Sequence, residues 1–367
     1  MKVNSFLLTG KTMFALLISA SLLTASCSKE DLEYKKRRRS STTTPTDPTT
    51  PEPAPTTPEP VPVPTTPSGT VKYLSLPESD AKTISGQSNV VIENLRFEDI
   101  DGNPLYIKGS NNITIRNCFF NKASMEAIVI ENSSNVKVEN CLFNGVTTGV
   151  YALSSESIRV DDNQFVNVRQ RSSGGRGQFV QFNGVSGSGN SVSNNEGENF
   201  AGESDPEDLI SLFRSSGTAS SPIVVRNNMF RGGGPSASGG GIMSGDYGGS
   251  YQIVENNTLL DPGQYGIAAA GGSNISLLNN KIFAKQQPFT NNPLYVWAQQ
   301  GAECSNITVK GNRVTWTDKS GTKNNGWNAG NCGGTSFEYP SAISVSELNV
   351  PAHLITMITP AELSAIR

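Results

Sequence analysis

Four acidic side chains and one basic side chain lie close together in residues 202–215 of this 367-residue chain. The stretch reads as an acidic loop, then an alternating strand, then the basic residue Arg214. Carboxylates act as general acids and bases, while a cation acts as a base or neutralises an acidic substrate. We therefore predict a catalytic centre built from Asp208, Arg214, Asp246 and Lys281.

The other acids of this loop are suited to a hard metal ion, because Ca²⁺ takes oxygen ligands from Asp and Glu. We predict Ca²⁺ as a cofactor, with Glu203, Asp205 and Glu207 as the carboxylates on the metal side. The sequence has no Cys-x-x-Cys pair, and its single His is His353, so it carries no zinc spacing. A Ser-His-Asp centre is disfavoured for the same reason.

Two reactions fit these residue types. β-Elimination on a uronic acid needs a neutralised carboxylate, a base for the C5 proton and an acid for the leaving oxygen. Hydrolysis needs two carboxylates across a cleft, and Asp208 and Asp246 flank two equivalent strands. We favour the lyase reaction, with the hydrolase and a glycan-binding or adhesive protein without turnover as alternatives. A solvated, turn-rich loop would also explain the acids.

Aromatic and polar residues alternate with apolar ones in the strands around this centre. Ile210 and Ile242 are predicted to point inward, so Ser211 and Met243 should face outward. Sugar C–H faces stack on aromatic rings while sugar hydroxyls form hydrogen bonds, so such a face suits a polysaccharide. The predicted substrate-binding residues are Arg176, Gln181, Tyr247, Tyr265, Tyr295 and Trp297.

A repeated motif, apolar-x-apolar-x-Asn-x-x-Phe, indicates which elements position these residues. One copy ends with Asn117 and Phe120, and the Asn position recurs every 22 to 33 residues. Short alternating strands repeated at this period are typical of a solenoid, in which each coil buries its apolar face against the next. The Asn suits a left-handed corner, and the Phe residues should stack inside the rod. The Asn positions are Asn94, Asn117, Asn140, Asp162, Asn194, Asn227, Asn256 and Asn279, with Gly311 in the last copy.

This repeat resembles the right-handed parallel β-helix of the pectate-lyase-like group over about residues 71–317. The resemblance implies an all-β, single-domain solenoid over residues 70–367 and a polysaccharide as substrate. Residues 202–215 also resemble the Glu-x-Ile-Ser-x-Lys-Ser strand of β-helical alginate lyases and chondroitinases. Phe213 stands where that motif has its Lys, and Arg214 follows one residue later. Asp205 to Asp208 resemble the Asp-Pro-His of β-helical mannuronan epimerases, without the His.

The N-terminal 69 residues have the composition of an export signal and a tether. Residues 1–26 carry two lysines and an apolar run, and they precede Cys27 in a context that resembles a bacterial lipobox. Residues 27–69 are rich in Pro and Thr and form the predicted linker. We expect an outer-membrane lipoprotein, exposed at the cell surface and monomeric, with lipid on Cys27. The basic run at residues 35–39 has no interleaved aromatics, so no nucleic-acid partner is expected.

The remaining cysteines fit an exported protein. Cys118 and Cys141 occupy one position of consecutive coils, about 5 Å apart, so a disulfide or two adjacent thiols are both compatible with the repeat. Cys304 and Cys332 are predicted to pair across a loop-rich region. Residues 359–367 begin with a Thr-Pro-Ala-Glu helix start and are predicted to form a helix over the last coil.

Overall fold

The computed structural model describes residues 71–171, 177–236 and 238–367. The predicted signal, Cys27, the linker and Arg176 lie outside these residues. Among the described residues, no helix is long and apolar enough to cross a membrane.

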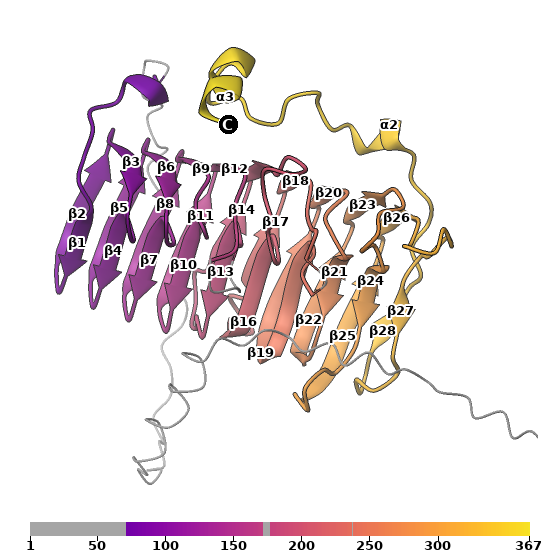
Figure 1. Cartoon of the computed structure of the whole chain (residues 1–367). Helices are drawn as coiled ribbons and strands as arrows, with labels where there is room; N and C mark the ends of the chain where they lie inside the picture. Colours follow the sequence, from indigo (N-terminus) through magenta and orange to yellow (C-terminus); the bar gives the residue numbers. More distant parts are fainter. Residues whose placement is uncertain (1–70, 172–176, 237) are drawn as a thin grey trace, which may run out of the picture.

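The described chain forms a rod of stacked coils whose strands pair in parallel (Figure 1). Each regular coil contributes one strand to each of three columns that run along the rod, and β19 spans the first two columns. The first column contains β1 (Lys82–Ser85), β4 (Leu105–Lys108), β7 (Ile128–Glu131), β10 (Val150–Leu153), β13 (Val180–Asn183), β16 (Ile210–Ser216), β19 (Ile242–Glu255), β21 (Tyr265–Ala269), β24 (Asn292–Val296) and β27 (Trp327–Asn328).

The second column contains β2 (Ser88–Glu93), β5 (Asn111–Arg116), β8 (Ser134–Glu139), β11 (Glu156–Asp161), β14 (Ser191–Ser193), β17 (Ile223–Arg226), the later part of β19, β22 (Gly272–Leu278), β25 (Cys304–Lys310) and β28 (Ser336–Phe337). The third column contains β3 (Arg96–Ile100), β6 (Phe119–Ala123), β9 (Leu142–Asn144), β12 (Gln164–Val166), β15 (Glu196–Glu198), β18 (Met229–Arg231), β20 (Thr258–Leu260), β23 (Lys281–Ala284) and β26 (Arg313–Trp316). This is the parallel β-helix that the repeat predicted.

The corner between the second and third columns is formed by the repeated Asn. All nine predicted positions have a left-handed backbone, with φ between 50° for Asn140 and 67° for Gly311. The residue after this Asn forms a buried ladder that the sequence analysis did not identify. Asn228, for example, donates its side-chain amide to the Oδ1 of Asn257 at 2.9 Å and to the carbonyl of Val192 at 2.9 Å. The ladder contains Asn163, Asn195, Asn228, Asn257, Asn280 and Asn312.

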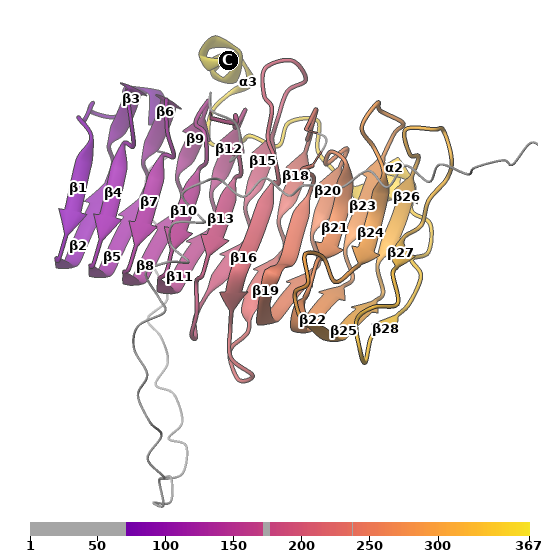
Figure 2. The same cartoon turned by 60° about the horizontal axis from the view of Figure 1, so that its bottom comes forward.

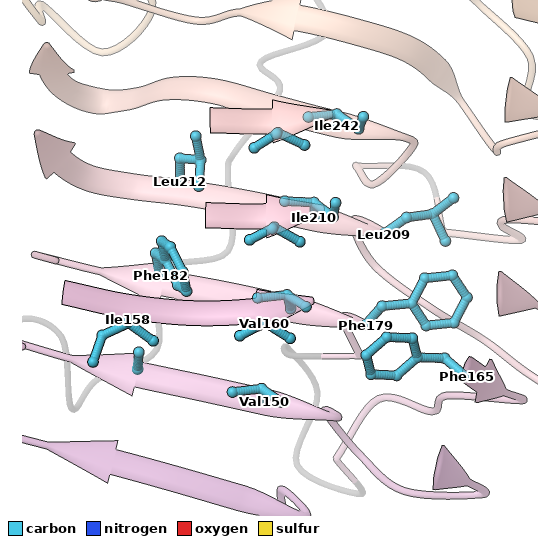
Figure 3. Packing of buried hydrophobic residues seen from close by; sticks show 14 of the residues in the cluster. Val150, Ile158, Val160, Phe165, Phe179, Phe182, Leu209, Ile210, Leu212 and Ile242 are labelled. Carbon is cyan, nitrogen blue, oxygen red and sulfur yellow. The ribbon is translucent and has the colours of Figure 1, made fainter. Parts of the chain in front are cut away.

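The predicted Phe stack fills the interior beside this corner. The rings of Phe97, Phe120 and Phe143 lie parallel, with centroids 4.9 and 5.0 Å apart. At β15 the Phe position is taken by Gly197, and Phe179 from the neighbouring column fills the gap (Figure 3). A Cβ on Gly197 would lie 2.4 Å from the Phe179 ring, so the missing side chain makes room for the inserted ring.

Of the predicted disulfides, one forms and one does not. Cys304 and Cys332 are bonded, with a Cα–Cα distance of 4.6 Å. Cys118 and Cys141 are buried free thiols, so of the two alternatives left open for this pair the adjacent thiols are found and the disulfide is not. They do occupy one position of consecutive coils, as expected. In-register parallel neighbours point their Cβ atoms the same way about 4.8 Å apart, whereas a disulfide needs Cβ atoms about 3.8 Å apart.

The C-terminal helix forms as predicted but lies elsewhere. In α3 (Pro360–Ile366) the N-cap Thr359 and Glu362 form the expected reciprocal capping pair. The helix lies near the start of the rod, not over the last coil (Figure 1). Residues 338–359, which include α2 (Val345–Leu348), run back along the outside of the third column.

An outward apolar patch on the third column explains this position. Phe119, Leu142 and Val166 point outward from β6, β9 and β12 and are buried by the C-terminal segment and by the short helix η1 (Tyr73–Ser75). Because these apolar side chains would otherwise face water, α3 is stabilised here and not at the open end. The third column is therefore covered, while the first column keeps its own outward face.

Candidate active site

The candidate site lies where the first column loses its regular register. β16 and β19 pair with two register shifts, one between Ser211 and Phe213 and one between Phe213 and Ser215. Each shift places one extra residue in β19. Bulges of this kind re-aim side chains and are common beside active sites.

The first shift brings Asp246 to the outward face. Ser211 pairs with Met243, but two residues later Phe213 pairs with Asp246, which is three residues after Met243. The extra residue, with Gly245 at φ 63°, thereby turns Asp246 to the side where Phe213 lies. Tyr247 follows with φ 53°, and its ring lies 5.0 Å from that of Phe213. A bulky residue in this conformation costs on the order of 1–2 kcal/mol, and such strain clusters at functional sites.

Asp208 precedes β16 and is held by two donors. Tyr265 donates its hydroxyl hydrogen to Oδ1 of Asp208 at 2.5 Å, and the backbone N–H of Gly240 donates to the same oxygen at 3.2 Å. Tyr265 starts β21, two coils beyond Asp208, and its ring passes over Gly240. A Cβ on Gly240 would lie 2.6 Å from that ring, so the glycine allows the contact across two coils.

The surroundings of Asp208 favour its protonated form. Burial is the largest cause, and it raises the pKa of the Asp208 carboxyl well above its usual range. The negative charges of Glu207 and Asp246 raise this pKa further, while the Tyr265 hydrogen bond lowers it. Asp246 lies on the adjacent strand β19, opposite Phe213. The predicted carboxylate pair shares one region of the first column.

An aromatic pocket adjoins this pair. It is lined by Met243, Tyr265 and Tyr295 together with Trp297 and Trp327. The Tyr265 and Tyr295 rings meet edge to face with centroids 5.5 Å apart. The remaining lining residues are Ser238, Gln264, Asn291, Asn292 and Gln299. Rings surrounded by amide and hydroxyl groups form a surface of the kind that a sugar can bind.

The outward positions of the first column lie in one register line, as the alternation predicted. Gln181 pairs with Ser211, which pairs with Met243. The line continues through Ala268 to Tyr295 and Trp327. Gln181, Tyr247, Tyr265, Tyr295 and Trp297 therefore all belong to the first column or its edges. Arg176, the sixth predicted binding residue, lies outside the described residues.

Arg214 occupies a backbone corner. It has φ 49° and follows the same register as Gly184, Ser154 and Asn132, the left-handed corners of earlier coils. Its side chain is exposed beside the Phe213–Asp246 pair. Among the described residues no hydrogen bond or ion pair joins Arg214 to Asp208. Arg214 thus lies at the edge of the site.

Lys281 lies on another face of the rod. It is the first residue of β23 in the third column, between Thr258 and Arg313. Its Nζ donates to the carbonyl of Glu347 at 3.5 Å. Asp208 lies on the first column, so the structure does not bring these two predicted catalytic residues together. The residue types of Asp208 and Lys281 both suit catalysis. Only the strand register shows that the two residues lie on different columns.

The three predicted metal-side acids make separate contacts. Glu203 forms an ion pair with Arg367, with oxygen–nitrogen distances of 2.5 and 2.9 Å. Asp205 accepts the backbone N–H of Gln170 at 3.0 Å, and Glu207 accepts from Gln178 at 3.4 Å. Within the described ranges, no group of three or more His, Cys, Asp or Glu side chains gathers to hold a metal. Ca²⁺ remains a prediction from the loop composition.

Two residues of the site were missed in the sequence. Gly240 lies in a Gly-rich run where no single glycine stands out, and only the path of the Tyr265 ring gives it a role. Trp327 lies beyond the last recognisable motif copy, which ends at Val314. The signal in the sequence that could have identified Trp327 is its position five residues before Cys332, which was predicted to form a disulfide.

Comparison with known proteins supports the architecture. A family model described as a right-handed β-helix region matches residues 76–206. No curated protein sequence matches the chain. Similar solved structures include PfbA, a surface adhesin of Streptococcus pneumoniae, with a TM-score of 0.45 and 17% identity over 72% of this chain and 62% of that one.

Two further structures are enzymes. The catalytic domain of a GH87 α-1,3-glucanase in complex with nigerose has a TM-score of 0.46 and 14% identity over 71% of this chain and 49% of that one. An alginate lyase from Paenibacillus sp. has a TM-score of 0.38 and 13% identity over 72% of this chain and 90% of that one. The chain thus spans 62% of the adhesin structure and about half of the glucanase domain. The right-handed β-helix description of the family model agrees with the parallel coils of residues 76–206.

Proposed function

We propose that this chain acts on a polysaccharide at the outward face of its first column, and that it hydrolyses glycosidic bonds with the carboxyl pair Asp208 and Asp246. One observation carries the proposal. A buried carboxyl with a raised pKa is held by Tyr265 at the edge of an aromatic pocket, and a second carboxyl, Asp246, lies on the adjacent strand β19. Pairs of acids whose environments separate their pKa values are typical of acid–base catalysis.

The roles of the two acids follow from their surroundings. Asp208, kept protonated by burial, donates its proton to the glycosidic oxygen as the bond to the anomeric carbon breaks. Asp246, which is partly exposed, accepts the proton of the attacking water or itself attacks that carbon. The water supplies a hydroxyl to the anomeric carbon and a proton to the acids, so both return to their starting states. Tyr265 keeps Asp208 in position throughout.

β-Elimination on a uronate-containing glycan is the second candidate. The exposed Arg214 beside Asp246 favours it, because a cation there would neutralise the uronate carboxylate. Asp208 would again protonate the leaving oxygen. The difference lies in the other step, in which a base removes the C5 proton and water is not consumed. The two reactions therefore share one acid but give different products.

The products decide between these reactions. The described domain, residues 71–367, would be incubated with laminarin, dextran, polygalacturonate and alginate. Hydrolysis releases reducing ends alone, whereas elimination also gives an unsaturated product that absorbs in the ultraviolet. Asp208→Asn should lower either rate by about 10²–10⁴-fold, as expected for loss of a general acid. Asp80→Asn is the matched control, because Asp80 is an exposed carboxylate far from Asp208 in the sequence.

The outcome also separates enzymes from binders. If none of the four polysaccharides is cleaved, but a gel that contains one of them slows the migration of the chain, the chain is a glycan-binding or adhesive protein. If Asp208→Asn cleaves as fast as Asp80→Asn, Asp208 is not the acid. Either result would remove the proposed mechanism.

We also propose that the domain is held at the outer surface of the outer membrane by lipid on Cys27. The lipobox-like context and the Pro/Thr-rich residues that follow support this. Cys27→Ser should move the full-length chain from the membrane fraction to the soluble fraction of a bacterial host. An unchanged membrane fraction would exclude lipid on this residue.

A further inference from the structure

The last coils of the first column present two tryptophans at the surface. Trp297 directly follows β24 and Trp327 starts β27, with ring centroids 5.6 Å apart and ring planes at 57°. Trp327 is 43% exposed, although Trp is usually well covered. Within the part of the chain that the structure describes, neither indole N–H has a hydrogen-bond partner. Both groups can therefore meet a ligand.

The two tryptophans are held on a prebuilt support. The segments that follow them are joined by the Cys304–Cys332 disulfide. Asn331 reinforces the same junction, because it accepts the N–H of Ala298 at 3.0 Å and donates to the Ala298 carbonyl at 3.2 Å. These bonds lie five residues or fewer from Trp327. A surface pair fixed in this way loses little side-chain entropy on binding.

The pair continues the pocket of the proposed active site. Trp327 pairs in register with Tyr295, whose hydroxyl accepts from Gln299 at 3.1 Å, and both tryptophans line the pocket that contains Tyr265. From β19, which carries Asp246, to β27 the column advances by three steps. At about 4.8 Å per step this is roughly 14 Å, a length that spans several sugar units.

We propose that Trp297 and Trp327 form a sugar-binding platform at the far end of the site, and that this platform sets a minimum length for the glycan. The inference rests on the proposed function for its position relative to the cleavage point. A glycan lying along the rod axis meets the carboxyl pair at β16 and β19 and stacks a distal sugar on the indoles. Pyranose rings with an uninterrupted C–H face fit this surface.

Affinity gels containing each of the four polysaccharides test the platform without any turnover. Trp327→Ala should weaken retention by the bound polysaccharide about tenfold, in line with loss of one aromatic contact. Trp327→Phe should restore most of it. Tyr339→Ala is the control, because Tyr339 is 57% exposed and lies past the end of the second column. Equal retention of Trp327→Ala and Tyr339→Ala would overturn the platform.

Chain length gives the second readout. For the cleaved polysaccharide, Trp327→Ala should raise KM for the polymer about tenfold and change kcat/KM for a disaccharide or trisaccharide of the same sugar by a much smaller factor. An equal effect on short and long substrates would overturn the length requirement. Failure of the proposed mechanism looks different, because it leaves Asp208→Asn active while Trp327→Ala still loses retention.

Discussion

The coils from β1 to β12 and the coils around β16 and β19 use the same corners but have different regularity. In the first region the repeated Asn recurs every 22 or 23 residues and the strands pair without register shifts. In the second region the spacing rises to 33 and 29 residues, and β19 carries two extra residues opposite β16. The rod therefore combines uniform coils with one irregular pair of strands.

The uniform coils contribute mainly packing, whereas the irregular strands β16 and β19 carry residues of the candidate site. In the uniform coils each inward side chain stacks on its equivalent, as in the parallel rings of Phe97, Phe120 and Phe143. Outward residues there pair as ion pairs such as Arg116 with Glu93, at 2.7 Å. In the irregular pair, the extra residues turn Asp246 and Tyr247 outward at a cost in backbone strain.

The largest expected effect is loss of a ring from the regular stack. Phe120 is fully buried between two parallel rings, so Phe120→Ala should lower the free energy of unfolding by about 3–5 kcal/mol. Urea unfolding followed by circular dichroism would measure it. Any activity per folded molecule should stay unchanged, because the stack contacts no site residue. Val91→Ala, at a side chain that is 54% exposed, should cost far less.

A loss of less than about 1 kcal/mol in Phe120→Ala would mean that the regular coils do not depend on the stack. Loss of activity in proportion to stability would be equally informative. It would show that the irregular strands unfold together with the regular coils, and the separation of roles drawn above would then be wrong.

The fold could be predicted because its signals are local and repeated. Asn117 alone is only a turn residue, but nine copies spaced 22 to 33 residues apart predict a corner. Reasoning from local patterns failed where contacts between residues distant in the sequence decide the structure. Gly197 breaks the Phe pattern, and the ring that fills the gap belongs to Phe179, the residue just before β13. Likewise, the capping signal located α3, but only the apolar patch at Phe119 explains where it lies.

The site could be predicted only in part, because register and bulges decide which residues meet. Asp208, Asp246, Tyr265 and Tyr295 were identified by their residue types, and the structure places them in one region. Lys281 fits the same types but begins a strand of the third column. A one-residue shift in pairing moves a side chain to the opposite face of the sheet. No local sequence pattern predicts the two extra residues of β19.

A smaller loss of stability is expected when Gly240 is replaced, because this position has no room for a side chain. In Gly240→Ala the new Cβ would meet the Tyr265 ring, so the ring must shift and its hydrogen bond to Asp208 must lengthen or break. We expect a loss of about 1–3 kcal/mol in the free energy of unfolding and a slower reaction. Thermal unfolding and product release would report the two effects.

Gly333→Ala is the matched control for this change. A Cβ at Gly333 has open space around it, so its stability should remain within about 0.5 kcal/mol of the wild type. If Gly240→Ala behaved like Gly333→Ala in both stability and activity, the contact between Tyr265 and Asp208 would not matter to the site. The irregular coils would then need another explanation for their glycines.

The smallest expected effect is a pH dependence that belongs to Asp208. Burial raises the pKa of this carboxyl in the folded state above its value of about 3.9 in an unfolded chain. Between these two values the folded state binds more protons than the unfolded state, so stability falls as pH rises through that interval. Asp208→Asn removes the titrating group but keeps a side-chain oxygen for Tyr265 and Gly240.

The free energy of unfolding of Asp208→Asn minus that of the wild type should therefore increase from pH 4 upward and level off above the folded-state pKa. Glu207, Asp246 and Tyr265 are present in both proteins, so the difference reports Asp208 together with its electrostatic interactions with these neighbours. A flat difference for Asp208→Asn would mean that this carboxyl titrates as it does in water, and the acid assigned to the irregular coils would lose its physical basis.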